Sequence, residues 1–164
     1  MWTVTDSPVG ELRLSEQDDA LVAIEFSPFR PLGLGEPRGE RADDHPLLAE
    51  AVRQLAAYFA GELRDFDLPL APAGSEFQLR VWAALTEIGY GETASYGEVA
   101  LRLGHTHVAS RAVGTANGRN PIPIVIPCHR VIGSTGTLTG YAGGLERKRL
   151  LLDLEQECLQ APLF

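Results

Sequence analysis

Short stretches in which apolar and polar residues alternate mark the beginning of the chain. They lie at residues 2–5, 10–14 and 20–26, and the residues between them include Pro, Ser and Asp. Alternation with a period of two, interrupted by turn-forming residues, is typical of antiparallel strands. The pattern predicts a small antiparallel meander, and Phe66-Asp67-Leu68 is a candidate for one further strand.

Apolar residues at intervals of three and four positions, the spacing of one helix face, follow in four later segments. Gly61 is placed to end the first of these segments, and Ser75 is placed to cap the second. The last two segments are short and are joined by a polar turn after Gly104, which is the outline of a helix-turn-helix. We therefore predict helices over 46–60, 75–88, 95–103 and 108–116.

Two stretches rich in Pro and Gly separate these elements. Residues 28–46 predict a loop, and residues 69–74 predict a linker between domains. A chain of 164 residues accommodates one domain or two small ones. We expect an α+β fold: an N-terminal α/β domain over 1–72, made of the small sheet and a helix, and a mostly helical domain over 73–164 that carries the helix-turn-helix.

The composition is that of a folded protein, with 45% hydrophobic and 22% charged residues. The first residues lack the features of a signal peptide, and no apolar run approaches the ~20 residues that span a bilayer, so we expect a cytoplasmic protein without membrane contact. Neither Cys128 nor Cys158 belongs to a cluster with metal-binding spacing. We therefore expect no structural disulfide, no metal and no cofactor.

The net charge of -8 argues against a nucleic-acid partner until it is divided by region. Residues 1–72 carry 14 Asp and Glu against 6 Arg, whereas residues 73–164 carry 8 acidic and 8 basic residues. DNA affinity depends on local cations that displace counterions, and not on the charge of the whole chain. The second region is therefore compatible with DNA binding.

The stretch from Asn120 to Gly133 is the most informative part of the sequence. Its three prolines exclude a helix, and the apolar residues among them predict a stiff, buried, extended segment that delivers Cys128 to a fixed point. A free cysteine is usually a buried apolar residue, and neighbours in an extended chain point to opposite sides. His129 can therefore contact the sulfur only if the backbone turns there, and the thiol needs a nearby base or cation to ionise near neutral pH.

Several short motifs between Phe77 and Glu155 occur in a fixed order. They are Arg111-Ala112-Val113-Gly114, Asn120-Pro121, Pro127-Cys128-His129-Arg130-Val131 and Tyr141-Ala142-Gly143-Gly144, with Tyr96 before them and Glu155 after them. This half of the chain resembles the catalytic domain of the O6-alkylguanine-DNA alkyltransferases, also called methylated-DNA protein-cysteine methyltransferases. The N-terminal part matches more loosely and lacks the cysteines that bind zinc in some relatives.

The resemblance implies a nucleophile, a base and an orienting carboxylate. Cys128 would be the nucleophile, His129 would take its proton through a water molecule, and Glu155 would orient His129 and stabilise its charge. Asn120 would brace the turn that holds the segment. The electrophile would be an alkyl carbon, so the thioether formed has no easy hydrolytic exit and each molecule would act once.

The resemblance also implies how the damaged base is recognised. The Tyr96 hydroxyl would meet guanine N3, the backbone amide of Ala142 would meet O6, and the carbonyls of Cys128 and Val131 would accept from the exocyclic amine. Some members have Ser at position 142. Alanine keeps the backbone donor and leaves more room in the pocket.

A target atom inside the base stack is unreachable, so the nucleotide would be extruded from the duplex. By the same resemblance, Arg111 would fill the gap that the extruded base leaves. Ala112 and Gly114 are small enough for close approach to a minor groove. Pro123 and Tyr141 would form the wall of the alkyl pocket.

The expected function is DNA repair by direct reversal in a single-turnover methyltransferase. The expected partner is double-stranded DNA that contains O6-alkylguanine, bound by a monomer. Repair of O4-alkylthymine and cooperative binding on DNA are left open. The alternatives are a damage sensor that binds alkylated DNA without repairing it, although such proteins lack the cysteine, and a cysteine hydrolase, which would need an oxyanion hole and would give the Arg111 helix no purpose.

Overall fold

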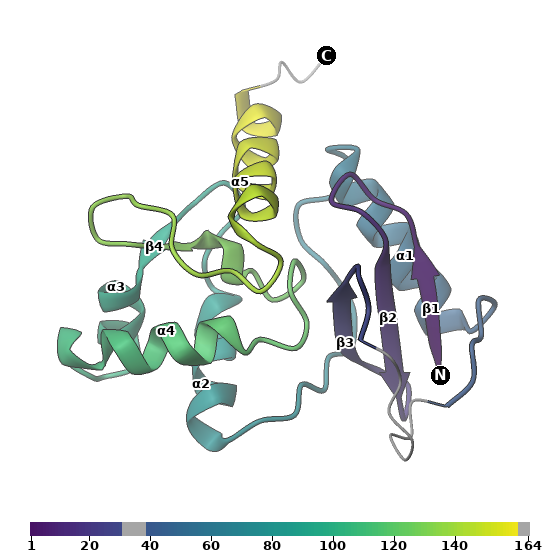
Figure 1. The fold of residues 1–164 in the computed structure, drawn as a ribbon, viewed down its shortest axis with the longest axis horizontal. Coiled ribbons are helices and arrows are strands. Elements are labelled where there is room, and N and C mark those ends of the chain that lie inside the picture. Colours follow the sequence, from purple (N-terminus) through teal and green to yellow (C-terminus); the bar gives the residue numbers. More distant parts are fainter. Residues whose placement is uncertain (31–38, 161–164) are drawn as a thin grey trace. The chain divides into compact units, whose positions relative to one another are not determined.

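The computed structural model describes residues 1–30 and 39–160, so part of the loop predicted over 28–46 lies outside the described residues. The chain divides into two compact units, Met1–Ala73 and Gly74–Phe164 (Figure 1). The division falls within the stretch at 69–74 that is rich in Pro and Gly. None of the helices in the described ranges combines the length and apolarity needed to cross a bilayer.

The first unit contains the predicted antiparallel meander. Its strands β1 (Trp2–Thr5), β2 (Leu12–Gln17) and β3 (Ala20–Phe26) pair in the order β1-β2-β3. Both turn residues between β2 and β3, Asp18 and Asp19, have positive φ values of 53° and 59°. A two-residue hairpin of this kind matches the right-handed twist of the strands that it joins. The middle strand begins two residues later than predicted and extends further.

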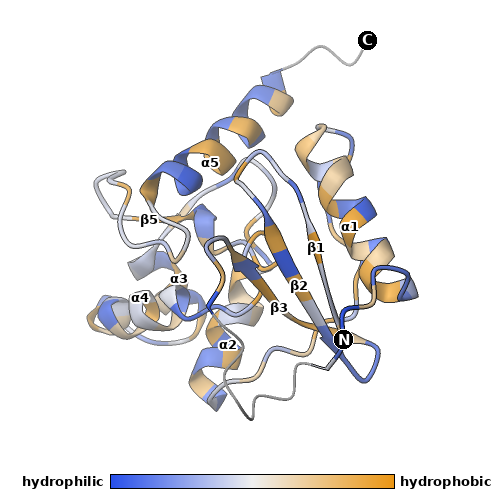
Figure 2. Cartoon of the chain, turned by 45° about the vertical axis from the view of Figure 1, so that its right-hand side comes forward, coloured by the Kyte–Doolittle hydropathy of each residue, from blue (hydrophilic) through white to orange (hydrophobic). Residues whose placement is uncertain are grey.

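Helix α1 (Pro46–Phe59) packs on this sheet and ends, as predicted, just before Gly61. Figure 2 shows hydrophobic and polar residues alternating along β2, the pattern of a strand with one covered face, whereas β3 is hydrophobic over most of its length. The core formed in this way is mainly apolar, and its most buried members are Leu12, Leu14, Leu21, Leu48, Leu55 and Tyr58.

The prediction of a further strand at residues 66–68 is wrong, because the backbone of Asp67 bonds to a side chain. The Asp67 amide donates to Gln54 Oε1 at 2.9 Å, and Gln54 Nε2 donates to the Asp67 carbonyl at 2.9 Å. Strand-like pairing occurs slightly later, where Leu21 donates to the Pro69 carbonyl at 2.8 Å. A helix side chain therefore satisfies the groups that a strand partner would have used.

The second unit contains the predicted helices. They are α2 (Glu76–Leu85), α3 (Tyr96–Arg102) and α4 (Ser110–Gly118), with a 3-10 turn η1 (His107–Ala109) leading into α4. Ser75 and Gln78 form a reciprocal capping box at the start of α2, as Ser95 caps α3 through the Glu98 amide. Helix α2 ends three residues earlier than predicted, because its last amides turn more tightly, as in the bond from Ile88 N to the Leu85 carbonyl.

The remaining elements hold the cysteine segment. A 3-10 turn η2 (Cys128–Arg130) leads into β5 (Val131–Ile132), which pairs in parallel with β4 (Ala94–Ser95). The long helix α5 (Leu145–Gln160) packs against η2. The Trp82 indole donates to the Ala116 carbonyl at 2.9 Å and so ties α2 to α4. The predicted fold class, a small antiparallel sheet with a helix followed by a mostly helical part, is confirmed.

Candidate active site

Cys128 lies in the turn η2, and its residue is only 2% exposed. The segment before it is buried, as predicted, but it is not extended: Ile126 N donates to the Ile122 carbonyl at 2.9 Å, and Ile124 has a φ of 74°. A β-branched residue rarely adopts that left-handed conformation, so the surrounding contacts must impose it. The chain thus folds back on itself and then turns at Cys128, which is the turn that a contact between the thiol and His129 requires.

Two asparagines hold this loop. Asn120 donates from Nδ2 to the Ile126 carbonyl at 2.8 Å and accepts from the Ile122 amide at 3.0 Å, so its side chain joins two points of the loop. Asn117 was not expected to contribute. Its Nδ2 donates to the carbonyl of Cys128 at 3.3 Å, so helix α4 is bonded directly to the cysteine turn.

The residue after the cysteine, His129, is completely buried and bonds to helix α5. Its Nε2 lies 2.7 Å from Glu155 Oε2, which fits the predicted pairing of base and carboxylate. Its Nδ1 is also buried and has no hydrogen-bond partner among the described residues. If Nε2 carries the proton toward Glu155, the Nδ1 lone pair is available to accept another proton.

Arg130 joins the same carboxylate. Its Nε donates to Glu155 Oε1 at 2.9 Å, its Nη2 donates to Glu155 Oε2 at 3.1 Å, and its Nη1 donates to the Ile88 carbonyl at 2.7 Å. The backbone amide of Gly91 adds a bond to Glu155 Oε1 at 3.2 Å. We call His129, Arg130 and Glu155 the buried charge cluster.

Burial and hydrogen bonding together determine which groups of this site are charged. Burial raises the pKa of the Cys128 thiol to about 11, although the Asn120 side chain and the Lys148 ammonium act in the opposite direction. Burial also lowers the pKa of His129, against the effect of Glu155. Burial would raise the pKa of Glu155, but bonds from His129 and Arg130 outweigh it and hold the value at about 2. At rest the site therefore contains a neutral thiol, a neutral imidazole and a carboxylate.

Lys148 is a second buried cation that the sequence did not single out. Its Nζ donates to the Val131 carbonyl at 2.6 Å and to the Thr139 carbonyl at 2.8 Å. Burial lowers its pKa, while the nearby Cys128 acts to raise it. The ammonium thus fixes two backbone segments and places a positive charge near the thiol.

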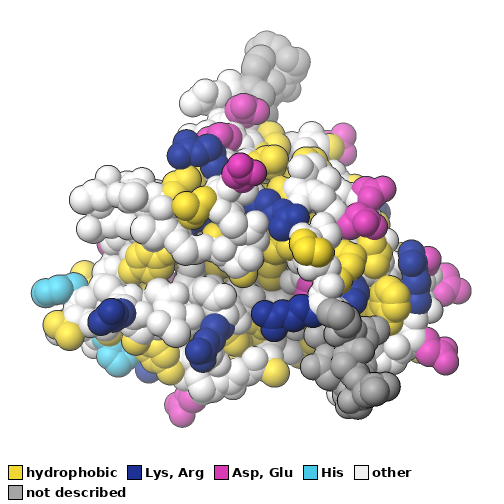
Figure 3. Space-filling view, in the orientation of Figure 1, with side chains coloured by type: hydrophobic (Ala, Val, Ile, Leu, Met, Phe, Trp, Pro, Cys, Tyr) yellow, Lys and Arg dark blue, Asp and Glu magenta, His cyan; other side chains and the backbone are white. Residues whose placement is uncertain are grey.

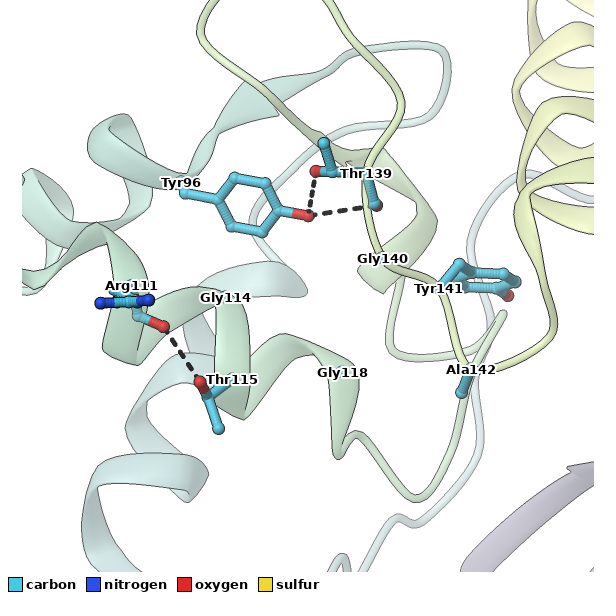
Figure 4. Close-up of a pocket in the computed structure, with 9 residues that line it drawn as sticks. All are labelled: Tyr96, Arg111, Gly114, Thr115, Gly118, Thr139, Gly140, Tyr141 and Ala142. Carbon is cyan, nitrogen blue, oxygen red and sulfur yellow. Dashed lines mark hydrogen bonds between the residues drawn. The ribbon is translucent and has the colours of Figure 1, made fainter.

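A cavity of about 550 Å³ lies between α4 and the loop that precedes α5 (Figure 4). The Tyr96 ring points toward Thr139, whose hydroxyl donates to the Tyr96 oxygen at 3.0 Å. The lining includes five of the residues assigned from the sequence to the base, the DNA or the alkyl pocket, together with four that were not assigned. The first five are Tyr96, Arg111, Gly114, Tyr141 and Ala142, and the others are Thr115, Gly118, Thr139 and Gly140.

Three residues predicted for the pocket or the DNA surface are not among those that line the cavity. Pro123 and Val131 are buried, and Ala112 is exposed on α4. Cys128 does not line the cavity either. Burial raises the pKa of the Tyr141 hydroxyl well above its ordinary value, and the nearby Cys128 acts in the same direction.

The surface around α4 is suited to a polyanion. On the face of the second unit seen in Figure 3, Lys and Arg side chains lie among mostly uncharged surface where Figure 1 places α4, and the visible Asp and Glu side chains gather mainly over α5. Cations concentrated on one face attract phosphate even when the whole chain is acidic.

A cluster of metal-ligand type occurs in the first unit, within the described residues. Ligand atoms of Glu16, Asp19 and His45 lie within 4.8 Å of one another. The terminal ammonium of Met1 pairs with Glu16 Oε1 at 3.0 Å, and His45 Nε2 is 3.8 Å from the same oxygen. The cluster is therefore already arranged as a network of opposite charges.

Two family models match the chain over most of its length. One is described as "6-O-methylguanine DNA methyltransferase, ribonuclease-like domain" and matches residues 1–72. The other is described as "6-O-methylguanine DNA methyltransferase, DNA binding domain" and matches residues 76–157. Together they define the class of protein, a methyltransferase that carries a DNA-binding domain.

Similar proteins agree with this class. The methylated-DNA--protein-cysteine methyltransferase of Mycolicibacterium paratuberculosis is 51% identical over 164 residues, which cover 99% of this chain and 96% of the relative. The enzyme of the same name from Methanosarcina acetivorans is 49% identical over 157 residues, which cover 96% and 99%. A crystal structure of Mycobacterium tuberculosis OGT in complex with DNA superposes with a TM-score of 0.85 at 48% identity and covers 96% of this chain and 93% of that one.

The chain belongs to the 6-O-methylguanine DNA methyltransferase family. The family and the enzyme class predicted from the sequence are confirmed, and so is DNA as the partner.

Proposed function

We propose that this protein repairs alkylated duplex DNA by moving the alkyl group from guanine O6 irreversibly onto Cys128. The observation that carries the proposal is the buried arrangement of Cys128, His129 and Glu155, in which His129 keeps a buried, unbonded Nδ1. A nucleophile, a base and a group that orients the base are the parts that covalent catalysis requires.

The reaction would begin with a proton transfer. Cys128 would lose its proton through one water molecule to His129 Nδ1, and the imidazolium would be stabilised by Glu155 at 2.7 Å. The thiolate would then attack the alkyl carbon as the bond from that carbon to O6 breaks. The electron pair of the broken bond would leave with guanine, and the product would be a thioether on the protein.

The leaving base would be stabilised from the cavity. Tyr96 now donates from its hydroxyl to the Thr139 carbonyl at 3.3 Å, and a guanine N3 could take over that proton donor. The amide of Ala142, which also lines the cavity, would face O6, where negative charge grows as the bond breaks. The carbonyls of Cys128 and Val131 would accept from the exocyclic amine, with Pro123 and Tyr141 as walls for the alkyl group.

Access to the buried thiol would require base flipping, which costs a few kcal/mol. Arg111 would occupy the gap in the stack, a role supported by its exposure on α4 and its place in the cavity lining. Ala112 and Gly114 leave this surface of α4 free of bulky side chains, which supports approach through the minor groove.

Intact mass spectrometry tests the proposal. After incubation with duplex DNA that contains O6-methylguanine, the protein should gain one methyl group, located on Cys128 and not on Cys158. A protein that binds this DNA but gains no mass would be a damage sensor. If one protein molecule turned over many substrates, the irreversible transfer would be contradicted, and the alternative of a cysteine hydrolase would be favoured.

A further inference from the structure

Arg130 is held more firmly than the transfer reaction alone explains. Its guanidinium makes two parallel bonds to Glu155 and one to the Ile88 carbonyl, and its side chain is 7% exposed. Its central carbon lies 5.7 Å from the centre of the Tyr90 ring. A paired guanidinium of this kind fixes both the position and the charge of its partner.

The charges around Glu155 explain how Arg130 affects the protonation of His129. A buried carboxylate that faced only His129 would favour the imidazolium, because an unpaired negative charge in the interior attracts a proton to its neighbour. With Arg130 also bonded, the carboxylate is already neutralised and the imidazole can stay uncharged. Lys148 on α5 adds a second positive charge that disfavours the imidazolium, and Glu155 is the group that favours it.

We propose that Arg130 is a positioning residue that holds Glu155 as a permanent carboxylate and keeps His129 neutral until it receives the proton of Cys128. The inference rests on the proposed function, because it assigns His129 the role of base. When the proton moves, Cys128 becomes negative and His129 positive, while Glu155 and Arg130 keep their charges. The total charge of the buried site therefore does not change.

The consequence concerns pH. Burial already lowers the pKa of His129, and Arg130 and Lys148 lower it further. Removing the charge of Arg130 leaves Glu155 to act more strongly on the ring, so the pKa of His129 must rise. Because His129 has to be neutral to accept a proton, the acid limit of alkyl transfer should move to higher pH with it.

The test compares Arg130→Met, Arg130→Gln and Arg130→Lys with Arg149→Met, a control at an exposed arginine on the same helix as Glu155. Two quantities are followed: the NMR titration of the His129 ring, and the pH dependence of single-turnover transfer from O6-benzylguanine. Both neutral variants should raise the two midpoints by at least about one pH unit, the size expected for one lost buried charge partner. Arg130→Lys should keep the midpoints near those of the wild type, and Arg149→Met should not move them.

Arg130→Gln keeps a neutral hydrogen-bond donor at this buried position, so it serves where the methionine variant does not fold. A wild-type midpoint for His129 in either folded neutral variant would overturn the inference. If the wild type transfers no alkyl group while the His129 titration shifts as described, the proposed function fails and the role of Arg130 toward His129 stands.

Discussion

The two sides of Cys128 differ in how completely their polar groups are already bonded. On the inner side, the Glu155 carboxylate is fully buried and is bonded to His129, twice to Arg130 and to the Gly91 amide. On the outer side, the cavity is lined in part by exposed residues, and one of them is Arg111 on α4. One side is rigid and charged, and the other is open.

The difference teaches that chemistry and DNA recognition are separable in this fold. A change in the buried charge cluster should affect the thiol whatever the substrate is, whether duplex DNA or a free base. A change on the exposed face of α4, which carries Arg111, should affect only substrates that have to be bound as DNA and flipped. Each variant can therefore be assigned to one side by testing it against both kinds of substrate.

The largest expected effect is that of Cys128→Ser. An alcohol ionises far less readily than a thiol, so transfer should be abolished, while the surface around α4 is untouched and DNA binding should persist. Methyl transfer is measured by mass spectrometry, and binding by fluorescence anisotropy. Cys158→Ser is the matched control and should behave as the wild type. Loss of DNA binding in a folded Cys128→Ser protein would show that the two sides are not separable.

Glu155→Gln should slow transfer to duplex and free base alike, by on the order of a hundredfold, the scale of general base catalysis. Asp153→Asn, an exposed change on the same helix, should have no effect. Single-turnover rates with both substrates provide the measurement. A rate loss confined to duplex DNA would show that Glu155 acts in DNA binding or flipping and not on the thiol.

The same variant should change the pH dependence of stability. The pKa of Glu155 is about 2 in the folded protein against an ordinary value of 4.5. The carboxylate therefore stabilises the fold fully above about pH 4.5, and this contribution, on the order of 3 kcal/mol, is lost as the pH falls toward 2. Urea unfolding from pH 7 to pH 3 should show a shallower decline in Glu155→Gln than in Asp153→Asn. Equal declines would mean that the pKa of Glu155 is not lowered in the folded protein.

Local signals predicted the elements well, whereas contacts distant in the sequence decided where prediction failed. The cap at Ser75 involves a residue three positions away, so the sequence predicts it directly. The false strand at 66–68 depended on Gln54, 13 residues away from Asp67. The extended segment before Cys128 failed for a similar reason, because Asn120 bends it through bonds to its own loop.

The candidate site shows the same limit. The motif around Cys128 indicated Cys128 and His129 as candidate nucleophile and base, and the resemblance added Glu155 to them. The role of Arg130 was missed although it belongs to that motif, because its partners lie 25 and 42 residues away. Lys148 was missed as well, since an isolated lysine on a helix usually faces solvent and nothing local indicates that it is buried.

On the open side, Arg111→Ala should slow repair of methylated duplex roughly ten- to a hundredfold, because Arg111 is the residue that we propose to offset the lost stacking. The reaction with free O6-benzylguanine needs no flipping and should be nearly unchanged. An abasic site opposite the lesion makes extrusion easier and should partly rescue the variant. Equal slowing of both reactions would show that Arg111 supports the cavity and does not act in flipping.

The smallest effect is expected for Arg119→Ala, at the end of α4. This residue is exposed and does not line the cavity, so we expect its charge to act only on phosphate. Affinity for duplex DNA should fall by roughly two- to fivefold at low salt, equally for methylated and unmethylated sequences.

Two further measurements distinguish the role of Arg119 from that of Arg111. The slope of log affinity against log salt concentration should fall by about 0.9 in Arg119→Ala, the value for one released counterion, and transfer from saturating duplex should be unchanged. An abasic site opposite the lesion should give it no rescue, because Arg119 takes no part in extrusion. If that site does rescue Arg119→Ala, flipping is shared along α4, and the boundary between phosphate contact and base extrusion has to be drawn beyond the end of this helix.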